Sequence, residues 1–178
     1  MKHIQLNDLN EMSKIYRLNL VNSITGYKSA HLIGSQSLDG KNNVAIFSSV
    51  IHLGSNPALI GFILRPTSVP RHTYSNIKAT GIFTLNAITK KQIKDAHHTS
   101  AKYPEEISEF DKTNLKIEKK GDWNAPFVKD VPIQMGCRYQ NEYHIKENDT
   151  KLIVASVEHF YVSESLLSVS YTHLTLPT

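Results

Sequence analysis

The stretch GSNPALIGFILRPTSVPRHTYSNI, residues 54–77, joins an apolar run, an interruption and a helical pattern. The continuous apolar run at 58–64 is typical of a strand buried on both faces. Two prolines then break regular structure, because proline lacks the backbone N–H that strands and helices use. A short helix is predicted to begin after Thr73, a good N-cap, and to end before Gly81, which suits a C-cap. A buried strand followed at once by a helix is therefore expected.

Three polar side chains, Arg71, Thr73 and Asn76, fall within about one turn of that helix start. A helix N-terminus presents free N–H groups and about half a positive charge, which together attract anions. Thr73 adds a hydroxyl donor, Arg71 a fork-shaped cation and Asn76 an amide. The group predicts a phosphate site beside the strand. In the alternative interpretation, Thr73 only caps the helix and Arg71 is solvated.

Most of the remaining chain reads as strands rich in β-branched and aromatic residues. Segments 29–37 and 42–51 flank LDGK, and Asp-Gly between two such runs is a strong hairpin signal. Asn148 and Asp149 predict a turn between the last two strands. The other strands are predicted at 81–88, 132–145 and 151–162. This pattern favours a small antiparallel barrel.

A second helix is predicted after Thr89, over KKQIKDAHH, with Ile93, Ala96 and His97 on one face. The adjacent His97 and His98 would point about 100° apart on a helix, so they cannot chelate one metal together. Residues 100–130 are rich in loop signals and too long for a plain connection, which suggests that they cover a site.

Composition narrows the class of protein. A chain of 178 residues suits one domain, and its net charge of +4 is spread along the sequence, which argues against nucleic-acid binding. The single cysteine, Cys137, excludes a disulfide framework and is expected to be a buried structural thiol. No run is apolar enough for a signal peptide or a membrane span, so we expect a cytoplasmic protein with no membrane partner. The P-loop, dinucleotide fingerprint, metalloprotease motif and nucleophile elbow are all absent from the sequence.

Together the segments AIFSSVIHLGSNPALIGFILRPTSVPRHTYSNIKATGIFTLNAI, AHHTSAKYPEEISEFD and APFV resemble the flavin reductase-like family of FMN-binding split barrels. The resemblance covers about residues 12 to 163. It implies a mainly β fold, a six-stranded antiparallel Greek-key split barrel with a few peripheral helices. It also implies a homodimer with FMN near the subunit interface.

The resemblance carries the following site residues over to this chain. The pyrimidine edge of the flavin would lie along Phe47, Ser48, Ser49 and Val50. The 5′-phosphate would be bound by Arg71, Thr73 and Asn76. The ribityl or phosphate region would lie near Ser100, Ala101 and Lys102. Lys28 would lie near the flavin, Arg65 near the ring or ribityl chain, and His97 on the nicotinamide side. The alternative for Ser48 and Ser49 is two hydroxyls that face water, although polar residues inside an apolar strand are unusual without a bonding partner.

The implied function is an NAD(P)H-dependent flavin reductase, in which a hydride passes from NADH or NADPH to flavin N5, for a partner monooxygenase or another electron acceptor. Because the cofactor performs the difficult step, no catalytic triad or carboxylate pair is required. An FMN-binding electron carrier of the flavoredoxin kind, without efficient nicotinamide turnover, is the alternative. A third interpretation is a barrel that has lost its flavin and serves as an interaction domain.

The chain departs from the family pattern at its end. We expect a flavin reductase-like domain over residues 1–164 and an atypical, possibly non-native tail over 165–178, which contains no Asp, Glu, Lys or Arg. Family members continue for some tens of residues with a different ending. A missing terminal segment would leave an unpaired edge or uncovered apolar surface, so the chain is expected to be less soluble than a full-length relative.

Overall fold

The structure is a computed structural model that describes residues 1, 3–104 and 106–167. The main sheet is formed by β1 (His31–Gln36), β2 (Asn42–Phe47), β3 (Ile51–Ser55), β4 (Ala58–Leu64), β5 (Ile82–Ala87), β8 (Ile133–Ile145) and β9 (Thr150–Val162). A second, small sheet pairs β6 (Ile117–Glu118) with β7 (Phe127–Val128). The helices are α1 (Leu6–Glu11), α2 (Lys14–Ser23), α3 (His72–Thr80), η1 (Lys90–Gln92), α4 (Ile93–His98), α5 (Glu109–Lys112) and α6 (Glu164–Leu167). The predicted tail lies outside the described residues from 168 onward.

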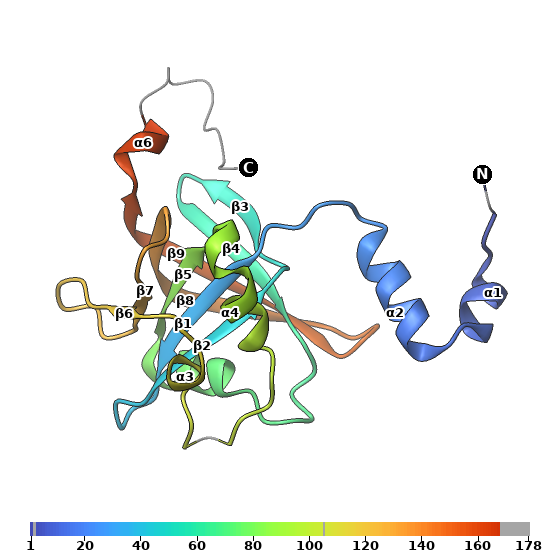
Figure 1. Cartoon of the computed structure of the whole chain (residues 1–178), viewed down its shortest axis with the longest axis horizontal. Coiled ribbons are helices and arrows are strands. Elements are labelled where there is room, and N and C mark those ends of the chain that lie inside the picture. The colour runs from blue at the N-terminus through green and yellow to red at the C-terminus, as the bar shows by residue number, and fades with distance from the viewer. Residues whose placement is uncertain (2, 105, 168–178) are drawn as a thin grey trace.

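The main sheet is antiparallel throughout, and its strand order is β2-β1-β5-β8-β9-β4-β3 (Figure 1). The expected mainly β, antiparallel class is confirmed, but the count of six strands is wrong, since this sheet has seven. The reason is local. The segment 42–51, read as one strand, forms β2, breaks at residues 48–50 and starts again as β3, which runs on to Ser55.

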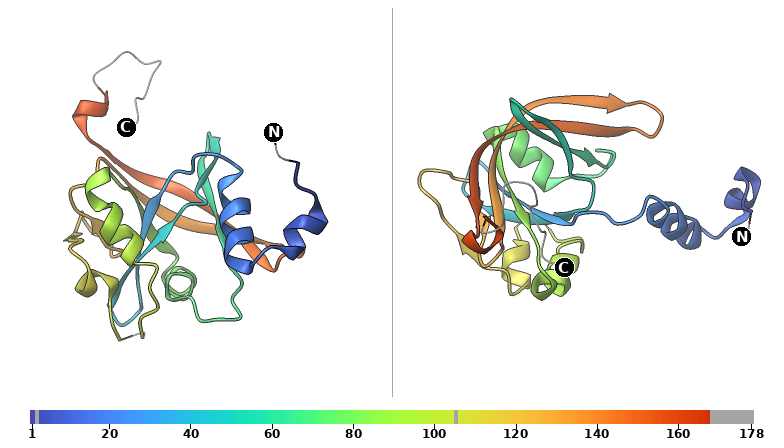
Figure 2. Two further views of the ribbon diagram at one scale, coloured as in Figure 1. Left: turned by 45° about the vertical axis from the view of Figure 1, so that its right-hand side comes forward. Right: turned by 90° about the horizontal axis from the view of Figure 1, so that it is seen from above.

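The break between β2 and β3 is also where the barrel closes. The two strands are consecutive in the chain yet occupy opposite ends of the strand order, so residues 48–50 span the split between the sheet edges (Figure 2). The Ser49 hydroxyl donates to the Ile63 carbonyl and accepts from the Ile63 N–H, both at 3.1 Å. The Ser49 side chain thus connects the segment 48–50 to β4 and fixes the two edges of the sheet relative to each other at the split.

Apolar residues fill two cores on opposite faces of β1. Ile33 points into the barrel, where Phe62 and Phe83 meet edge to face with centroids 5.8 Å apart. Leu32, its neighbour in sequence, faces outward into a second core that Phe110 of α5 covers. The strand is therefore buried on both faces, as alternating side chains require. Cys137 lies in the inner core, which confirms the predicted buried thiol, and burial raises its pKa.

Helix α3 lies beneath the β8–β9 hairpin and is held there by a polar cluster. Tyr74 donates its hydroxyl to the Glu142 carboxylate at 2.9 Å, and Lys151 Nζ lies 2.7 Å from the same carboxylate. The helix ends at Gly81, whose left-handed φ of 74° confirms the predicted C-cap. The predicted start was wrong. The helix begins at His72 with Arg71 at the N-cap, because the Thr73 side chain bonds to Asn43 on β2.

Candidate functional site

The predicted flavin-contacting run lies at the end of β2, an edge strand whose outward N–H groups need partners from outside the sheet. Val44 N–H donates to Glu109 Oε2 at 3.2 Å, and Ile46 N–H donates to Thr99 Oγ1 at 2.9 Å. Outward N–H groups alternate along a strand, so Ser48, which is exposed, is next in this row. The row of outward N–H groups on β2 therefore extends past the end of the strand to Ser48, at the split.

The side chains of this run have different surroundings. Phe47 points inward and meets Phe62 edge to face, with centroids 5.1 Å apart. Ser48 is exposed, whereas the Ser49 hydroxyl is used by Ile63, so two water-facing hydroxyls are not what the structure shows. Val50 packs partly buried against the inner core. What this segment offers to a ligand is therefore the backbone and the hydroxyl of Ser48.

The start of α3 is joined to β1 and β2 by buried polar side chains. The Thr73 hydroxyl lies 3.0 Å from the Asn43 amide, and Asn76 Nδ2 donates to Ser35 Oγ at 3.2 Å. All four of these side chains are buried. Thr73 and Asn76 thus stand together, as the sequence predicted, and both hold the first turn of the helix against the sheet.

Arg71 and the free N–H groups of the first turn remain available at this helix start. Ser75 donates its N–H to the Arg71 carbonyl at 2.9 Å, so the N–H groups before Ser75 precede the first intrahelical bond of the helix. Arg71 is half-buried, and its Nε donates to the Pro66 carbonyl at 3.4 Å, which leaves the two terminal nitrogens of the guanidinium for another partner. This donor set suits a phosphate group.

A buried carboxylate lies on the same edge of β2. Glu109 is 7% exposed, and burial raises the pKa of its carboxyl, opposed by its hydrogen bond from Val44 and by nearby His72. Turned so that its nitrogen faces Glu109, the Asn43 amide donates to Oε2 at 3.3 Å while its oxygen accepts from Thr73. Glu109, Asn43 and Thr73 then form one chain of hydrogen bonds from α5 to α3.

Glu109 should make the stability of the protein fall as the pH rises. Its folded-state pKa lies above the ordinary value of 4.5, so its contribution is fully present below pH 4.5 and is lost as the pH rises through the raised pKa. Thermal melting of the wild type and of Glu109→Gln between pH 4 and 8 measures this. The melting temperature of the variant is expected to rise relative to that of the wild type as the pH rises. A constant difference across the range would contradict the prediction.

The other predicted site residues lie around the same split, on three connections. Ser100, Ala101 and Lys102 follow Thr99, whose bond to Ile46 holds this loop beside β2. Ser100 Oγ donates to the His97 carbonyl at 2.6 Å, and the His97 side chain is exposed. Arg65 is exposed immediately after β4, and Lys28 is exposed on the connection that leads into β1. Ile93, Ala96 and His97 share one face of α4, as predicted, but only Ala96 of that face is buried.

The sequence analysis missed His31, which stands opposite Phe47 in the β1–β2 register. Its Nδ1 is buried and has no hydrogen-bond partner among the described residues, and burial lowers the pKa of the imidazole. An unpaired buried nitrogen costs about 1–3 kcal/mol, so it marks a place where a ligand with a polar edge would be stabilising. His31, Ser48 and the start of α3 thus present polar groups of the kind that a ligand with a polar ring and a phosphate would use.

Asn43, Thr99 and Glu109 were missed as well, for a common reason. Their bonds join residues far apart in sequence, 65 positions for Val44 and Glu109 and 53 for Ile46 and Thr99. No local pattern signals such a contact. The only available hint was the loop-rich stretch 100–130, which was expected to cover a site and which supplies Glu109.

Comparison with known proteins identifies the fold and the family together. The model of the flavin reductase-like domain matches residues 28–174. The chain belongs to this family. A flavin reductase-like structure from Shewanella frigidimarina NCIMB 400, assigned as a flavin reductase with a split barrel domain, is 38% identical with a TM-score of 0.90, and the match covers 94% of this chain and 83% of that one. The split-barrel prediction is confirmed.

Two more distant matches are one solved structure of the same fold and one relative in sequence. Nitrilotriacetate monooxygenase component B from Bacillus cereus is 22% identical, with a TM-score of 0.78 over 93% of this chain and 83% of that one. An uncharacterized protein of Methanothermobacter thermautotrophicus is 28% identical over 75% of this chain. The chain spans 63% of the length of that relative. Within the described residues, no helix is long and apolar enough to cross a membrane.

Proposed function

We propose that this protein binds FMN at the split of its barrel and reduces it with NADH or NADPH. The observation that supports this most is the alignment of two donor sets along β2. The row of outward N–H groups, of which those of Val44 and Ile46 are bonded to Glu109 and Thr99, reaches Ser48 at its end. The first turn of α3 is tied to the same strand through Asn43. Family membership supplies the reaction class, flavin-dependent oxidoreduction. In this proposal, the donors at Ser48 bind the ring of the ligand and the donors at the first turn of α3 bind its phosphate.

The residues have distinct roles in this proposal. Arg71 and the N–H groups of the first turn of α3 bind the phosphate, while Thr73 and Asn76 fix that turn against β1 and β2. The backbone at residues 47–50 and the hydroxyl of Ser48 contact the pyrimidine edge of the ring. Further contacts to the ribityl chain and ring come from Lys28, Arg65, Ser100, Ala101 and Lys102.

A bound flavin would accept a hydride from reduced nicotinamide, so the chain itself needs to bind, orient and exclude water. The exposed His97 borders the side from which the nicotinamide would approach. We propose that the protein acts as a homodimer and passes its electrons to a partner monooxygenase or another acceptor. The likeness to a monooxygenase component of the same fold supports the monooxygenase as partner.

The phosphate site is tested by comparing FMN with riboflavin, which has the ring and ribityl chain but no phosphate. In fluorescence titrations, Arg71→Ala should weaken FMN binding about tenfold to a hundredfold and leave riboflavin binding unchanged. Arg138→Ala is the matched control, because Arg138 on β8 pairs with Glu158 on β9, away from the start of α3 in the chain. Wild-type protein that binds the two flavins equally well would refute the phosphate assignment.

A second measurement separates the two candidate functions. NADH or NADPH, added under anaerobic conditions to the FMN-loaded protein, should reduce the flavin and bleach its absorbance as fast as the protein turns over. Bleaching by dithionite alone would make the protein an electron carrier instead of a reductase. A purified chain that retains no flavin and binds none in titration would remove both functions.

A further inference from the structure

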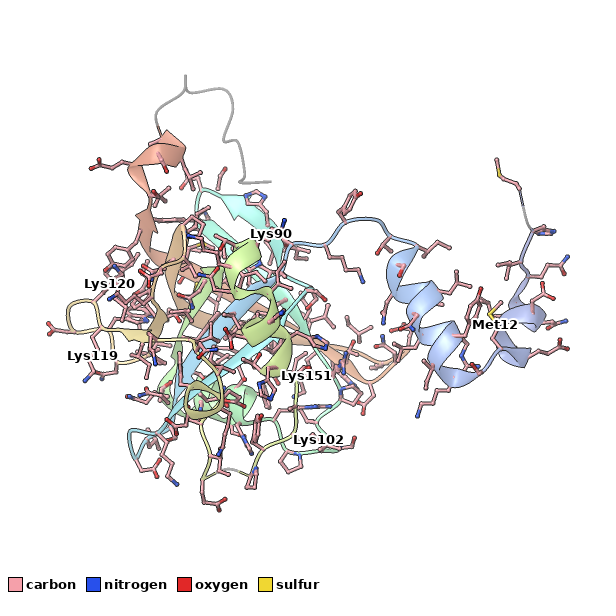
Figure 3. All side chains as sticks on the ribbon, in the orientation of Figure 1. Met12, Lys90, Lys102, Lys119, Lys120 and Lys151 are labelled. Carbon is pink, nitrogen blue, oxygen red and sulfur yellow. The ribbon has the colours of Figure 1, made fainter. Side chains whose placement is uncertain are left out.

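The first thirty residues form an apolar arm that projects from the barrel. We call residues 1–30 the arm; it comprises α1, α2 and the connection to β1 (Figure 1). Neither helix of the arm has a buried residue. Ile15 is 75% exposed and Ile24 77% exposed, and further large apolar side chains of the arm are also exposed: Leu6, Tyr16, Leu18, Val21 and Tyr27. Figure 3 shows Met12 of the arm on the opposite side of the molecule from Lys119 and Lys120.

Such an arm is not stable in water as it stands. Helices of 6 and 10 residues are too short to persist without tertiary contacts. Ile15, Leu18 and Val21 are spaced three residues apart, so they form one apolar stripe along α2, and all three side chains are exposed. A helix with an apolar stripe normally buries that stripe against another surface. The arm therefore requires a surface that covers it.

The same chain carries a matching apolar surface on the outside of the barrel. Leu53 and Leu152 both lie over Gly61, where a Cβ would meet their Cδ1 atoms at 2.9 and 3.1 Å. In the strand registers Ile51 stands opposite Gly61, and Tyr143 stands opposite Leu152, so all four side chains share one face. We call this face the outer patch: Ile51, Leu53, Tyr143, Leu152 and Val154.

The outer patch faces away from the rest of its own molecule. Glu142 and Lys151, the neighbours in sequence of Tyr143 and Leu152, point to the opposite face, where both bond to Tyr74 of α3. Because side chains alternate along a strand, the patch lies on the side without α3. Ile51 is 47% exposed and Tyr143 57% exposed. Polar side chains are expected on an outer sheet face that only meets water.

We propose that the arm of one chain docks on the outer patch of a second copy of this chain. The two surfaces occur on the same polypeptide, so one two-fold exchange covers two arms and two patches with a single contact geometry. Burying a large aliphatic side chain removes roughly 60–120 Å² of apolar surface from water. The arms and the patches together would then bury on the order of 2,000 Å², which is the size of a stable interface. This inference adds the contact surface to the proposed homodimer and does not depend on flavin.

Cross-linking between differently tagged chains tests the exchange. One chain carries Leu18→Cys in the arm, the other Tyr143→Cys in the patch, and the two are co-expressed. The native Cys137 is fully buried, so it does not compete. A disulfide-linked species containing both tags is expected on a non-reducing gel. The control pairs Leu18→Cys with Leu38→Cys, an equally apolar position that is 80% exposed in the β1–β2 turn, and should give none.

The outcomes separate the exchange from its alternatives. A cross-link that forms only when both cysteines are on one chain would mean that the arm covers its own barrel, and would overturn the exchange. Ile15→Glu with Leu18→Glu should halve the mass in light scattering, whereas Leu38→Glu should not. If the double variant remains a dimer in light scattering and no mixed cross-link forms, the protein is a homodimer but the arm does not hold it together, and the proposed docking is refuted. A wild-type monomer would refute both, whatever its flavin affinity.

Discussion

Replacing Gly34 with alanine should destabilise the protein by about 3–5 kcal/mol, the sum of overpacking and of lost buried hydrogen bonds. A Cβ at this position would lie 2.1 Å from the Pro126 carbonyl oxygen and 2.5 Å from Thr84 Oγ1. Neither atom can move freely, because Thr84 Oγ1 donates to that carbonyl at 2.6 Å. The segment around Pro126 must therefore lift from β1, and the hydrogen bond breaks with it.

Thermal unfolding measures this effect against a matched glycine. Gly61 also lies inside a strand, but its Cβ would meet mainly the flexible ends of Leu53 and Leu152, together with one backbone oxygen at 3.1 Å. For a domain of this size, 3–5 kcal/mol corresponds to a fall in Tm of roughly 10 °C, and Gly61→Ala should lose clearly less. Similar losses in the two variants would show that the approach of Pro126 to β1 is not the cause.

What could be predicted from the sequence was decided by local pattern. The apolar run at 58–64 coincides with β4, and the turns at Asp39–Gly40 and Asn148–Asp149 stand where Gly, Asp and Asn indicated them. Gly40 and Asp149 both have positive φ, 85° and 56°, which is why these residue types signal turns. Each of these features depends on neighbours within a few residues, so one sequence suffices to find it.

What could not be predicted depends on contacts between distant residues. The split at residues 48–50 is fixed by Ser49 bonding to Ile63 on β4. Ser48 and Ser49 stand out as polar residues in the run 42–51, but the run itself does not show that the strand breaks there. The start of α3 was misplaced for the same reason. Thr73 has the composition of an N-cap, but its hydroxyl is taken by Asn43, 30 positions earlier. Arg71, Thr73 and Asn76 could be grouped from the sequence because they are close in the chain, whereas Asn43 and Ser35, which bond to Thr73 and Asn76, could not.

The second large effect is expected at Asn86, which is fully buried and joins three parts of the chain. Its Nδ2 donates to the Leu32 carbonyl at 3.0 Å and to Thr84 Oγ1 at 2.9 Å, while its Oδ1 accepts the Val128 N–H at 2.9 Å. Asn86→Leu keeps the branched shape of the side chain and leaves the Leu32 carbonyl and the Val128 N–H without this partner in the core, while Thr84 Oγ1 keeps its bond to Pro126. At about 1–3 kcal/mol for each of the two groups, the loss should be about 2–6 kcal/mol.

The control for Asn86 is Asn42, whose Oδ1 accepts from Gln36 Nε2 at 2.9 Å near the surface, where water can replace the bond. Asn42→Leu should cost less than about 1 kcal/mol. Amide hydrogen exchange gives a local measurement, since the Val128 N–H should lose its protection in Asn86→Leu and keep it in Asn42→Leu. Unchanged protection at Val128 would contradict the assigned bond.

Combining the two large changes tests whether they act on one structural unit. Gly34→Ala lifts the segment at Pro126, and Asn86→Leu releases the same segment at Val128, two residues further on. Once one change has freed the segment, the other change can remove fewer of its remaining contacts. The stability lost in the double variant should therefore be smaller than the sum of the two single losses by about 1 kcal/mol or more. Strict additivity would mean that β1 and β5 hold the segment independently. A shortfall would show that residues 125–128 dock as one cooperative piece, which is how part of a loop-rich stretch comes to be ordered against β1 and β5.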